Sequence, residues 1–314
     1  MVKRLLLASP RGYCAGVERA VETVERALAL YGSPVYVRKQ IVHNSHVVED
    51  LRSRGAVFVD ALAEVPEGAT VVFSAHGIAP AVRREAGELG LTTIDATCPL
   101  VTKVHAQARR YAEAGYALVL IGHAGHEEVE GTLGEAPDAI VLVQSAEDAE
   151  HVSLPADQPL AYLTQTTLSV DETGEIVAVL RRRFPRIEGP AREDICYATS
   201  NRQWAVKELL REIDLLLVVG SANSSNSQRL VDVARAEGTP AHLVDDLRAI
   251  DESWLDGCTT VGLTSGASAP ERLVAELCAW FSARGAEVCE QEPVHEDVSF
   301  KLPVELRRAE RAAA

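Results

Sequence analysis

Aromatic residues, basic residues and long apolar runs are all scarce in this sequence. Aromatic residues make up 5% of the 314 positions, and there is a single Met, so the core has to be built mainly from Ala, Val and Leu. Lys and Arg number 31 against 46 Asp and Glu, which gives a net charge of −15. Proteins that bind nucleic acids or membrane surfaces by neutralising phosphates have the opposite balance. Because no apolar run reaches the roughly 18 residues of a transmembrane helix, neither nucleic acid nor membrane is an expected partner.

Familiar cysteine and nucleotide motifs are absent as well. The six cysteines, at positions 14, 98, 196, 258, 278 and 289, form no C-x-x-C pair and no zinc-finger spacing. There is no Walker A loop and no G-x-G-x-x-G fingerprint, so a nucleotide is not indicated. The apolar stretch at residues 5–8 is too short for a signal peptide. We therefore expect a cytoplasmic protein, a location in which disulfide frameworks are rare.

The sequence does contain a regular alternation of strand-like and helix-like segments. Its 47% apolar and 25% charged residues are typical of a globular protein. Short apolar runs rich in β-branched residues alternate with helical periods, which predicts parallel sheets joined by crossover helices. The predicted strands are 5–9, 35–38, 56–60, 70–75, 92–96, 116–121, 139–143, 160–165, 194–197, 215–220, 241–244 and 260–265.

Three of the cysteines mark an internal repeat of roughly 90 residues. Cys14, Cys98 and Cys196 each end a strand-like run and precede a helical segment. The strand after that helix ends in a polar loop, and a later strand ends in a second one. The first loops contain His43, His126 and Ser224, which follow their cysteines by 29, 28 and 28 residues, and the second loops contain His76, Thr166 and Ser268.

This repeat predicts three similar α/β domains. Their expected boundaries are 14–97, 98–195, and 196–284 together with 1–13, whose strand would complete the third sheet; the tail 285–314 would pack across another domain. Ligands of open parallel sheets bind beyond the carboxyl ends of the strands. We therefore expect three small α/β domains with mainly parallel sheets in a pseudo-threefold arrangement around a central cavity, where the cysteines and polar loops converge.

Three thiolates without a fourth partner point to a particular kind of metal centre. Iron–sulfur clusters are usually held by four cysteines, so three ligands would leave one iron open to a substrate oxygen, as a catalytic zinc keeps one position open. The alternative is that these cysteines are small buried core residues. That reading suits Cys278, which shares an apolar helix face with Leu273, Val274, Leu277 and Phe281.

Two further patterns suggest an anion site and a proton donor. The segments 221–227, 266–270 and 76–80 each follow a strand and precede a helix, where free backbone N–H groups and hydroxyls can bind a phosphate or diphosphate. The alternative is that they are ordinary helix caps. Glu128 follows His126 closely, and a carboxyl group beside a histidine in a buried pocket is a natural proton donor. The glutamates after His126 could also form a solvated helix start.

Nine motifs occur in order along nearly the whole chain: PRGYCAGV at 10–17, IVHN at 41–44, SAHG at 74–77, DATCPLV at 95–101, HEEVEGT at 126–132, TQTTLS at 164–169, CYAT at 196–199, SSNS at 224–227 and GASAP at 266–270. In these motifs the sequence resembles the 4-hydroxy-3-methylbut-2-enyl diphosphate reductase family, whose members catalyse the last step of the non-mevalonate isoprenoid pathway.

The resemblance implies a reductive dehydroxylation of the allylic diphosphate to isopentenyl and dimethylallyl diphosphates, with two electrons, two protons and release of water. Ferredoxin or flavodoxin would donate the electrons, and the allylic hydroxyl would bind the open iron of a [4Fe–4S] cluster with three cysteine ligands. The implied cluster ligands are Cys14, Cys98 and Cys196. The implied diphosphate ligands are His43, His76, His126, Ser224, Ser225, Asn226 and Ser268. The implied catalytic residues are Glu128, Thr166 and His126: Glu128 would supply protons through Thr166. Thr167 and Thr199 would line the pocket.

One position departs from the family pattern, because this chain has Glu127 where Pro is usual. We expect the change to loosen the loop that holds Glu128. Two other functions remain as alternatives: an iron–sulfur dehydratase like quinolinate synthase, which is similar in architecture only, and a non-enzymatic iron–sulfur redox sensor.

Overall fold

The computed structural model describes residues 2–155 and 157–313, and within them every strand belongs to one of three parallel sheets. The prediction of three small parallel sheets, each with flanking helices, is confirmed. The arrangement of the three around a common cavity stays a prediction. The contacts divide the chain into two compact units. Unit 1 comprises residues up to 18, 43–49 and 197–299, and unit 2 comprises 19–42, 50–196 and the residues from 300 onward.

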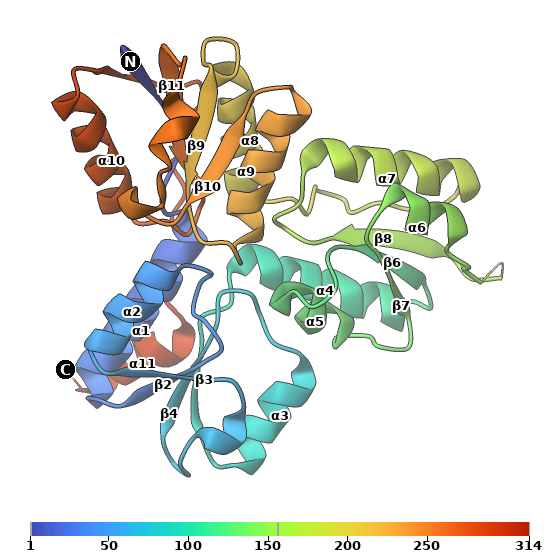
Figure 1. Ribbon diagram of the computed structural model, residues 1–314. Coiled ribbons are helices and arrows are strands. Elements are labelled where there is room, and N and C mark those ends of the chain that lie inside the picture. Colours follow the sequence, from blue (N-terminus) through green and yellow to red (C-terminus); the bar gives the residue numbers. More distant parts are fainter. Residues whose placement is uncertain (1, 156, 314) are drawn as a thin grey trace. The chain divides into compact units, whose positions relative to one another are not determined.

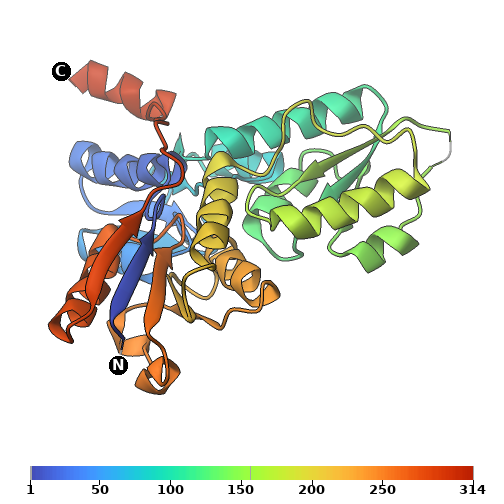
Figure 2. The same cartoon turned by 90° about the horizontal axis from the view of Figure 1, so that it is seen from above.

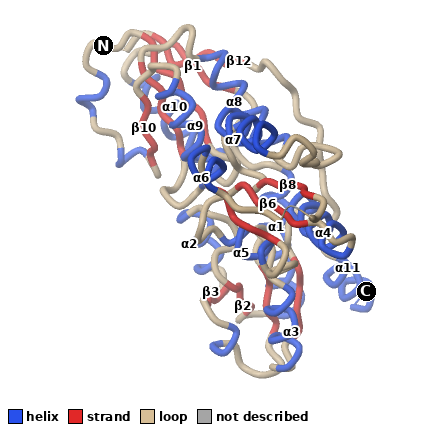
Figure 3. Tube along the Cα trace, turned by 90° about the vertical axis from the view of Figure 1, so that its right-hand side faces the viewer, coloured by secondary structure: helices blue, strands red, loops and turns tan. Residues whose placement is uncertain are grey.

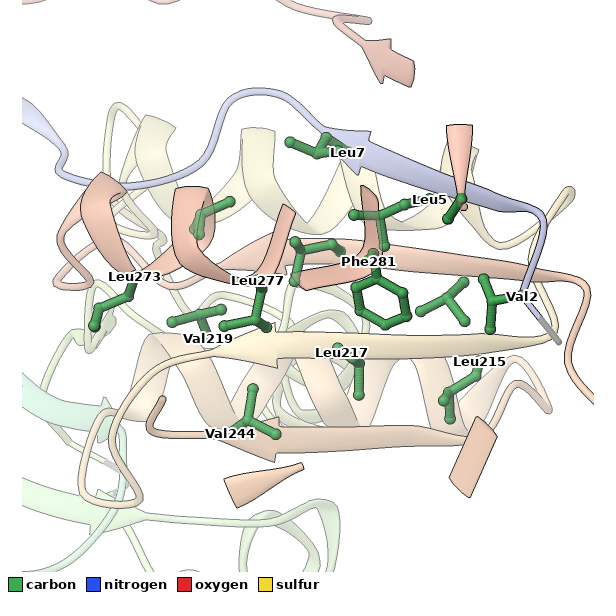
Figure 4. Packing of buried hydrophobic residues seen from close by; sticks show 14 of the residues in the cluster. Val2, Leu5, Leu7, Leu215, Leu217, Val219, Val244, Leu273, Leu277 and Phe281 are labelled. Atoms are coloured by element: carbon green, nitrogen blue, oxygen red, sulfur yellow. The ribbon is translucent and has the colours of Figure 1, made fainter. Parts of the chain in front are cut away.

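Sheet A lies in unit 1 and has the order β10-β9-β11-β1-β12. Its strands are β1 (Arg4–Ala8), β9 (Leu215–Val219), β10 (Ala241–Val244), β11 (Thr260–Ser265) and β12 (Glu287–Gln291). One face packs on α10 (Glu271–Ala283), where Leu5, Leu217 and Phe281 share a buried cluster (Figure 4). The other face packs on α8 (Tyr197–Leu209) and α9 (Ser225–Ala236). Strand β1 pairs with β11 and with β12, so the N-terminal strand sits among strands from the end of the chain (Figure 2).

Sheets B and C lie in unit 2, with the orders β3-β2-β4-β5 and β7-β6-β8. In sheet C, α6 and α7 cover one face and α4 and α5 the other (Figure 1); α4 runs beside β6 and β8 (Figure 3). The strands are β2 (Val35–Arg38), β3 (Ala56–Val59), β4 (Thr70–Phe73), β5 (Thr92–Asp95), β6 (Ala117–Ile121), β7 (Ile140–Val143) and β8 (Leu160–Thr164). The helices of this unit are α3 (Pro80–Glu88), α4 (Pro99–Glu113), α5 (Glu127–Leu133), α6 (Ala146–His151), α7 (Val170–Arg183) and α11 (Val304–Ala313).

Two helices, α1 (Ala15–Tyr31) and α2 (Ser45–Ser53), have residues in both units. Short 3₁₀ turns complete the described chain at Leu62–Glu64, Leu247–Ala249 and Glu252–Leu255. In unit 2, α11 contacts β5, and Glu310 forms an ion pair with Arg26 of α1 at 3.7 Å. Among the described residues, no helix combines the length and hydrophobicity that crossing a membrane requires. The three domain boundaries drawn from the repeat remain a prediction.

The expected strand at 194–197 is wrong. Residues 194 and 195 form a bend, and α8 begins at Tyr197. The side chain of Asp194 explains the difference: its carboxylate accepts the N–H of Thr164 (3.2 Å) and lies 3.0 Å from Lys103 Nζ, so side-chain contacts hold this segment. Next to β8, Glu188 forms only an isolated bridge with Ala161.

Strand β12 was not predicted, because its sequence is polar rather than apolar. It is an edge strand whose side chains are mostly exposed, including Glu287 and Glu290. Charged residues are common on edge strands because they discourage pairing with other chains. A polar sequence therefore concealed a strand that pairs with β1 over five residues.

Candidate active site

In unit 1, the loop between β9 and α9 carries the serine-rich segment that was predicted to hold an anion. Ser224 is the N-cap residue of α9, and its Oγ accepts hydrogen bonds from the backbone N–H (3.3 Å) and the Oγ (3.0 Å) of Ser227. Gly220 and Gly266 lie so close to Ser227 that a Cβ on either would collide with its side chain. The hydroxyls are thus fixed at the start of a 12-residue helix, where backbone N–H groups favour anions.

Asn226 joins this loop to the one after β11. Its Nδ2 donates to Thr199 Oγ1 on α8 (3.2 Å), and its Oδ1 accepts the N–H of Ala267 (2.8 Å). The carbonyl of Ala267 in turn accepts the N–H of Cys14 (3.2 Å). A single amide side chain therefore connects the Cys14 loop with a helix and a loop that both contain predicted ligands.

His43 and Ser268 also come together in unit 1. Ser268 Oγ donates to the carbonyl of His43 (2.9 Å) and lies 3.5 Å from Ser224 Oγ. Asn223 Nδ2 is 3.4 Å from His43 Nδ1. Ser225 is half-buried at the start of α9. The predicted residues that are almost fully buried in this unit are Thr199, Ser224, Asn226 and Ser268.

The sequence analysis did not predict Asp245, whose carboxylate links two of these segments by hydrogen bonds. Its carboxylate accepts hydrogen bonds from Ser45 Oγ (2.7 Å) and Ser221 Oγ (2.6 Å), and the N–H of Ser45 donates to Ser221 Oγ (3.0 Å). The loop that follows His43 is thereby tied to the loop that precedes Ser224. The available signal was position, because Asp245 directly follows β10, at the strand end where polar loops gather.

In unit 2, Glu128 and Thr166 form a buried hydrogen-bonded pair. The carboxylate of Glu128 accepts the N–H of Thr166 at Oε1 (2.7 Å) and its hydroxyl at Oε2 (3.0 Å). Glu128 is only 2% exposed. Burial raises the pKa of Glu128 above its ordinary value, although the two hydrogen bonds from Thr166 act in the opposite direction. The protonated form is therefore favoured more than in an exposed glutamate.

His126 is the N-cap residue of α5 and remains uncharged near neutral pH. Burial, followed by the charge of His76, lowers the pKa of His126 to about 4. Its Nδ1 accepts the N–H of Glu128 (3.2 Å), which requires an unprotonated nitrogen at that position. The centroids of the His76 and His126 rings are 5.8 Å apart in an edge-to-face arrangement. Two predicted diphosphate ligands thus lie beside the predicted proton donor.

The contacts of Glu127 do not support the expected loosening of this loop. Glu127 is the first residue of α5, the helical position that proline also favours. Its Oε2 accepts a hydrogen bond from Ser74 Oγ (3.2 Å) and lies 3.3 Å from His76 Nδ1. Burial alone would raise the pKa of Glu127, but the hydrogen bond and charge of His76 hold it below its ordinary value. The carboxylate is thus tied to the loop after β4.

Thr167 lies beside Thr166 but has a different partner. Its Oγ1 accepts a hydrogen bond from Gln165 Nε2 (2.9 Å), and Gln165 Oε1 accepts the N–H of His123 (3.1 Å). Gln165 is 1% exposed. This amide connects the loop after β8 with the loop after β6, the two loops that carry the predicted residues of sheet C.

The three predicted cluster ligands have matching local surroundings. Cys14, Cys98 and Cys196 are half-buried, and each directly precedes the first residue of a helix, namely α1, α4 and α8. Their backbone N–H groups donate to carbonyls in the three second polar loops, at Ala267 (3.2 Å), Ala75 (3.0 Å) and Thr166 (3.0 Å). All six cysteines lie among the described residues, and none of them is in a disulfide. Cys278 packs against the core of sheet A.

Comparisons with known proteins agree over almost the full length of the chain. The family model described as LytB protein matches residues 5–282. The 4-hydroxy-3-methylbut-2-enyl diphosphate reductase of Acidothermus cellulolyticus is 60% identical over 312 residues, covering 99% of this chain and 92% of the relative. The reductase of the same name from Cutibacterium acnes is 57% identical, covering 99% and 97%. A solved structure of the E-1-hydroxy-2-methyl-but-2-enyl-4-diphosphate reductase from Plasmodium falciparum matches with a TM-score of 0.97 at 39% identity, over 100% of this chain and 99% of that chain.

Proposed function

The chain belongs to the LytB family, and from this premise we propose that it reduces 4-hydroxy-3-methylbut-2-enyl diphosphate at a [4Fe–4S] cluster held by Cys14, Cys98 and Cys196. Members of the family are iron–sulfur reductases of the non-mevalonate isoprenoid pathway. The observation that carries the proposal is the matched setting of the three cysteines, each held through its N–H by a polar loop.

The chemistry of these positions suits an iron–sulfur cluster. Each of the three cysteines directly precedes a helix, and the helix dipole favours negative charge at that end. Near Cys98, the guanidinium of Arg19 donates to the carbonyls of Ala96 (2.9 Å) and Thr97 (3.0 Å) and brings a positive charge to the same loop. When bound, a cluster with three protein ligands supplies electrons and one iron that can accept a substrate oxygen.

The serine-rich loops of unit 1 suit the diphosphate group. Hydroxyls, one amide and the N-terminus of α9 are positioned by mutual hydrogen bonds, so their orientation is set before an anion arrives. Neutral donors bind an anion without the high positive charge that this acidic chain lacks. We assign diphosphate binding to His43, His76, His126, Ser224, Ser225, Asn226 and Ser268, with Thr167 and Thr199 lining the pocket.

Glu128 and Thr166 suit the delivery of a proton. With its pKa raised by burial, Glu128 holds a proton at a pH where an exposed glutamate has lost it. When Oε2 is protonated, its hydrogen bond with Thr166 Oγ1 (3.0 Å) reverses direction, so the proton can pass to this hydroxyl oxygen while the hydroxyl gives its own proton to the substrate oxygen. The departing hydroxyl then leaves as water. As the resemblance implies, ferredoxin or flavodoxin would donate the electrons, in the cytoplasm.

The first test concerns the cluster itself. Cys98→Ser should abolish the charge-transfer absorption around 400 nm of anaerobically purified protein and lower its iron content. Cys278→Ser is the matched control, because Cys278 packs against a hydrophobic core cluster and should retain both signals. Equal spectra and iron contents for the two variants would exclude the proposed ligand set. Turnover of the allylic diphosphate with a chemical reductant then separates a reductase from a redox sensor, which would bind the cluster without turnover.

A further inference from the structure

His105 is a buried histidine for which the proposed reaction has no role. It lies on α4 of unit 2 and is 5% exposed. Its Nδ1 is 2.9 Å from Glu135 Oε1, and both side chains of this pair are at most 6% exposed. Glu135 also accepts a hydrogen bond from Arg109 Nη1 (2.6 Å). The imidazole is therefore fixed at one edge by a carboxylate that is itself held on its other side.

The Cε1–Nε2 edge of the His105 ring packs against two glycines. A Cβ built on Gly77 would lie 2.9 Å from Cε1, and one on Gly131 would lie 3.1 Å from it, both too close for an ordinary contact. Nε2 at this edge is buried and has no hydrogen-bond partner among the described residues. Such an unsatisfied buried nitrogen is unusual and calls for an explanation.

The two glycines belong to the two segments that carry the proposed reactive groups. Gly77 directly follows His76, and Gly131 lies on α5, three residues after Glu128. The ring edge thus touches both the His76 loop and the helix of Glu128. It is also close enough that the charge of His105 opposes the rise in the pKa of Glu128 that burial causes.

We propose that His105 is a positioning residue that sets the spacing between the His76 loop and the helix carrying Glu128. Glu135 holds the ring, and Gly77 and Gly131 give it room. The inference rests on the proposed function, since it assigns no new reaction. It adds that the position of Glu128, the proposed proton donor, depends on His105, a residue outside the set assigned to the substrate.

The test is a double-mutant cycle between His105 and Gly131. His105→Asn keeps a donor for Glu135 but removes the ring edge, so kcat should fall at least about tenfold, as expected when a reacting group is misplaced. Gly131→Ala crowds the ring and should lower kcat to a smaller extent. In the double variant the added methyl group occupies space that the ring has left, so kcat should exceed the value given by multiplying the two single effects.

The control is Gly174→Ala, which places the same substitution in a helix of the same unit, where a Cβ would have nothing within 4 Å. It should retain the wild-type kcat. Thermal midpoints are measured alongside to establish that each variant is folded. Independent, multiplying effects on kcat, or altered midpoints with unchanged kcat, would overturn the proposal. If the wild type itself fails to turn over the allylic diphosphate, it is the proposed function that fails.

Discussion

The site residues of unit 1 and those of unit 2 differ in whether they can change their charge. In unit 1, apart from Cys14 and His43, they are hydroxyls and an amide. In unit 2 the predicted residues include two histidines and Glu128, and Glu127 adds a second carboxylate. The serine-rich loops therefore keep the same charge across the physiological pH range, whereas the histidine–glutamate cluster depends on protonation.

On the proposed assignment, this difference lets one acidic chain both bind a diphosphate and donate a proton. A diphosphate needs donors that are present whatever the pH, and buried hydroxyls at a helix N-terminus meet that need. A proton donor needs a pKa shifted toward the working pH, and burial provides this for Glu128. The comparison predicts that variants of the hydroxyls and the amide of unit 1 act on binding, and that variants of Glu128 in unit 2 act on turnover.

The largest expected effect is that of Glu128→Gln. The amide preserves the shape of the side chain but cannot supply a proton, so kcat should fall by about 10²–10⁴-fold while the substrate still binds. Glu130→Gln on the same helix is the control; its carboxylate is 52% exposed and pairs with Lys39, and kcat should stay near the wild-type value. Steady-state kinetics with a chemical reductant measures both. Near-normal turnover of the Glu128 variant would show that Glu128 is not the proton donor.

A smaller effect, on binding, is expected for Ser224→Ala combined with Asn226→Ala. Hydrogen bonds to a charged group contribute about 1.5–3 kcal/mol each, so affinity for inorganic diphosphate should fall by at least about tenfold in calorimetry. Because the deleted donors are neutral, the loss should be the same at pH 6 and pH 8. Ser282→Ala, at an exposed position of α10 in the same unit, is the control. A loss that changes strongly with pH would contradict the contrast between the two units.

The sequence predicted most of the sheets because buried parallel strands have distinctive apolar runs. It also predicted the loops that carry Ser224 and Thr166, since the repeat placed each polar loop after such a strand. The prediction failed where tertiary contacts, rather than the local sequence, determine the backbone conformation. The segment before Cys196 has strand-like composition, but the ion pair between Asp194 and Lys103 bends it.

Two supporting residues of the site were missed for a related reason. Asp245 directly follows β10, but its serine partners are distant in the sequence. His105 pairs with Glu135, and no local pattern distinguishes such a buried ion pair from a solvated one. Glu127 illustrates the same point. A change from proline suggested a looser loop, yet its carboxylate contacts Ser74 and His76, more than 50 residues earlier.

The smallest effect, on stability, is expected for Glu127→Gln, and it compares two adjacent glutamates whose pKa values shift in opposite directions. The folded-state pKa of Glu127 lies below its ordinary value of 4.5, so its charge stabilises the protein above pH 4.5, and this contribution is lost as the pH falls through the folded-state value. Glu127→Gln should therefore lower the free energy of unfolding at pH 6 by about 1 kcal/mol. The difference in the free energy of unfolding between the variant and the wild type should narrow below pH 4.5. Urea unfolding at a series of pH values measures it, and a gap that widened toward acid would mean that Glu127 is not held as a carboxylate by His76.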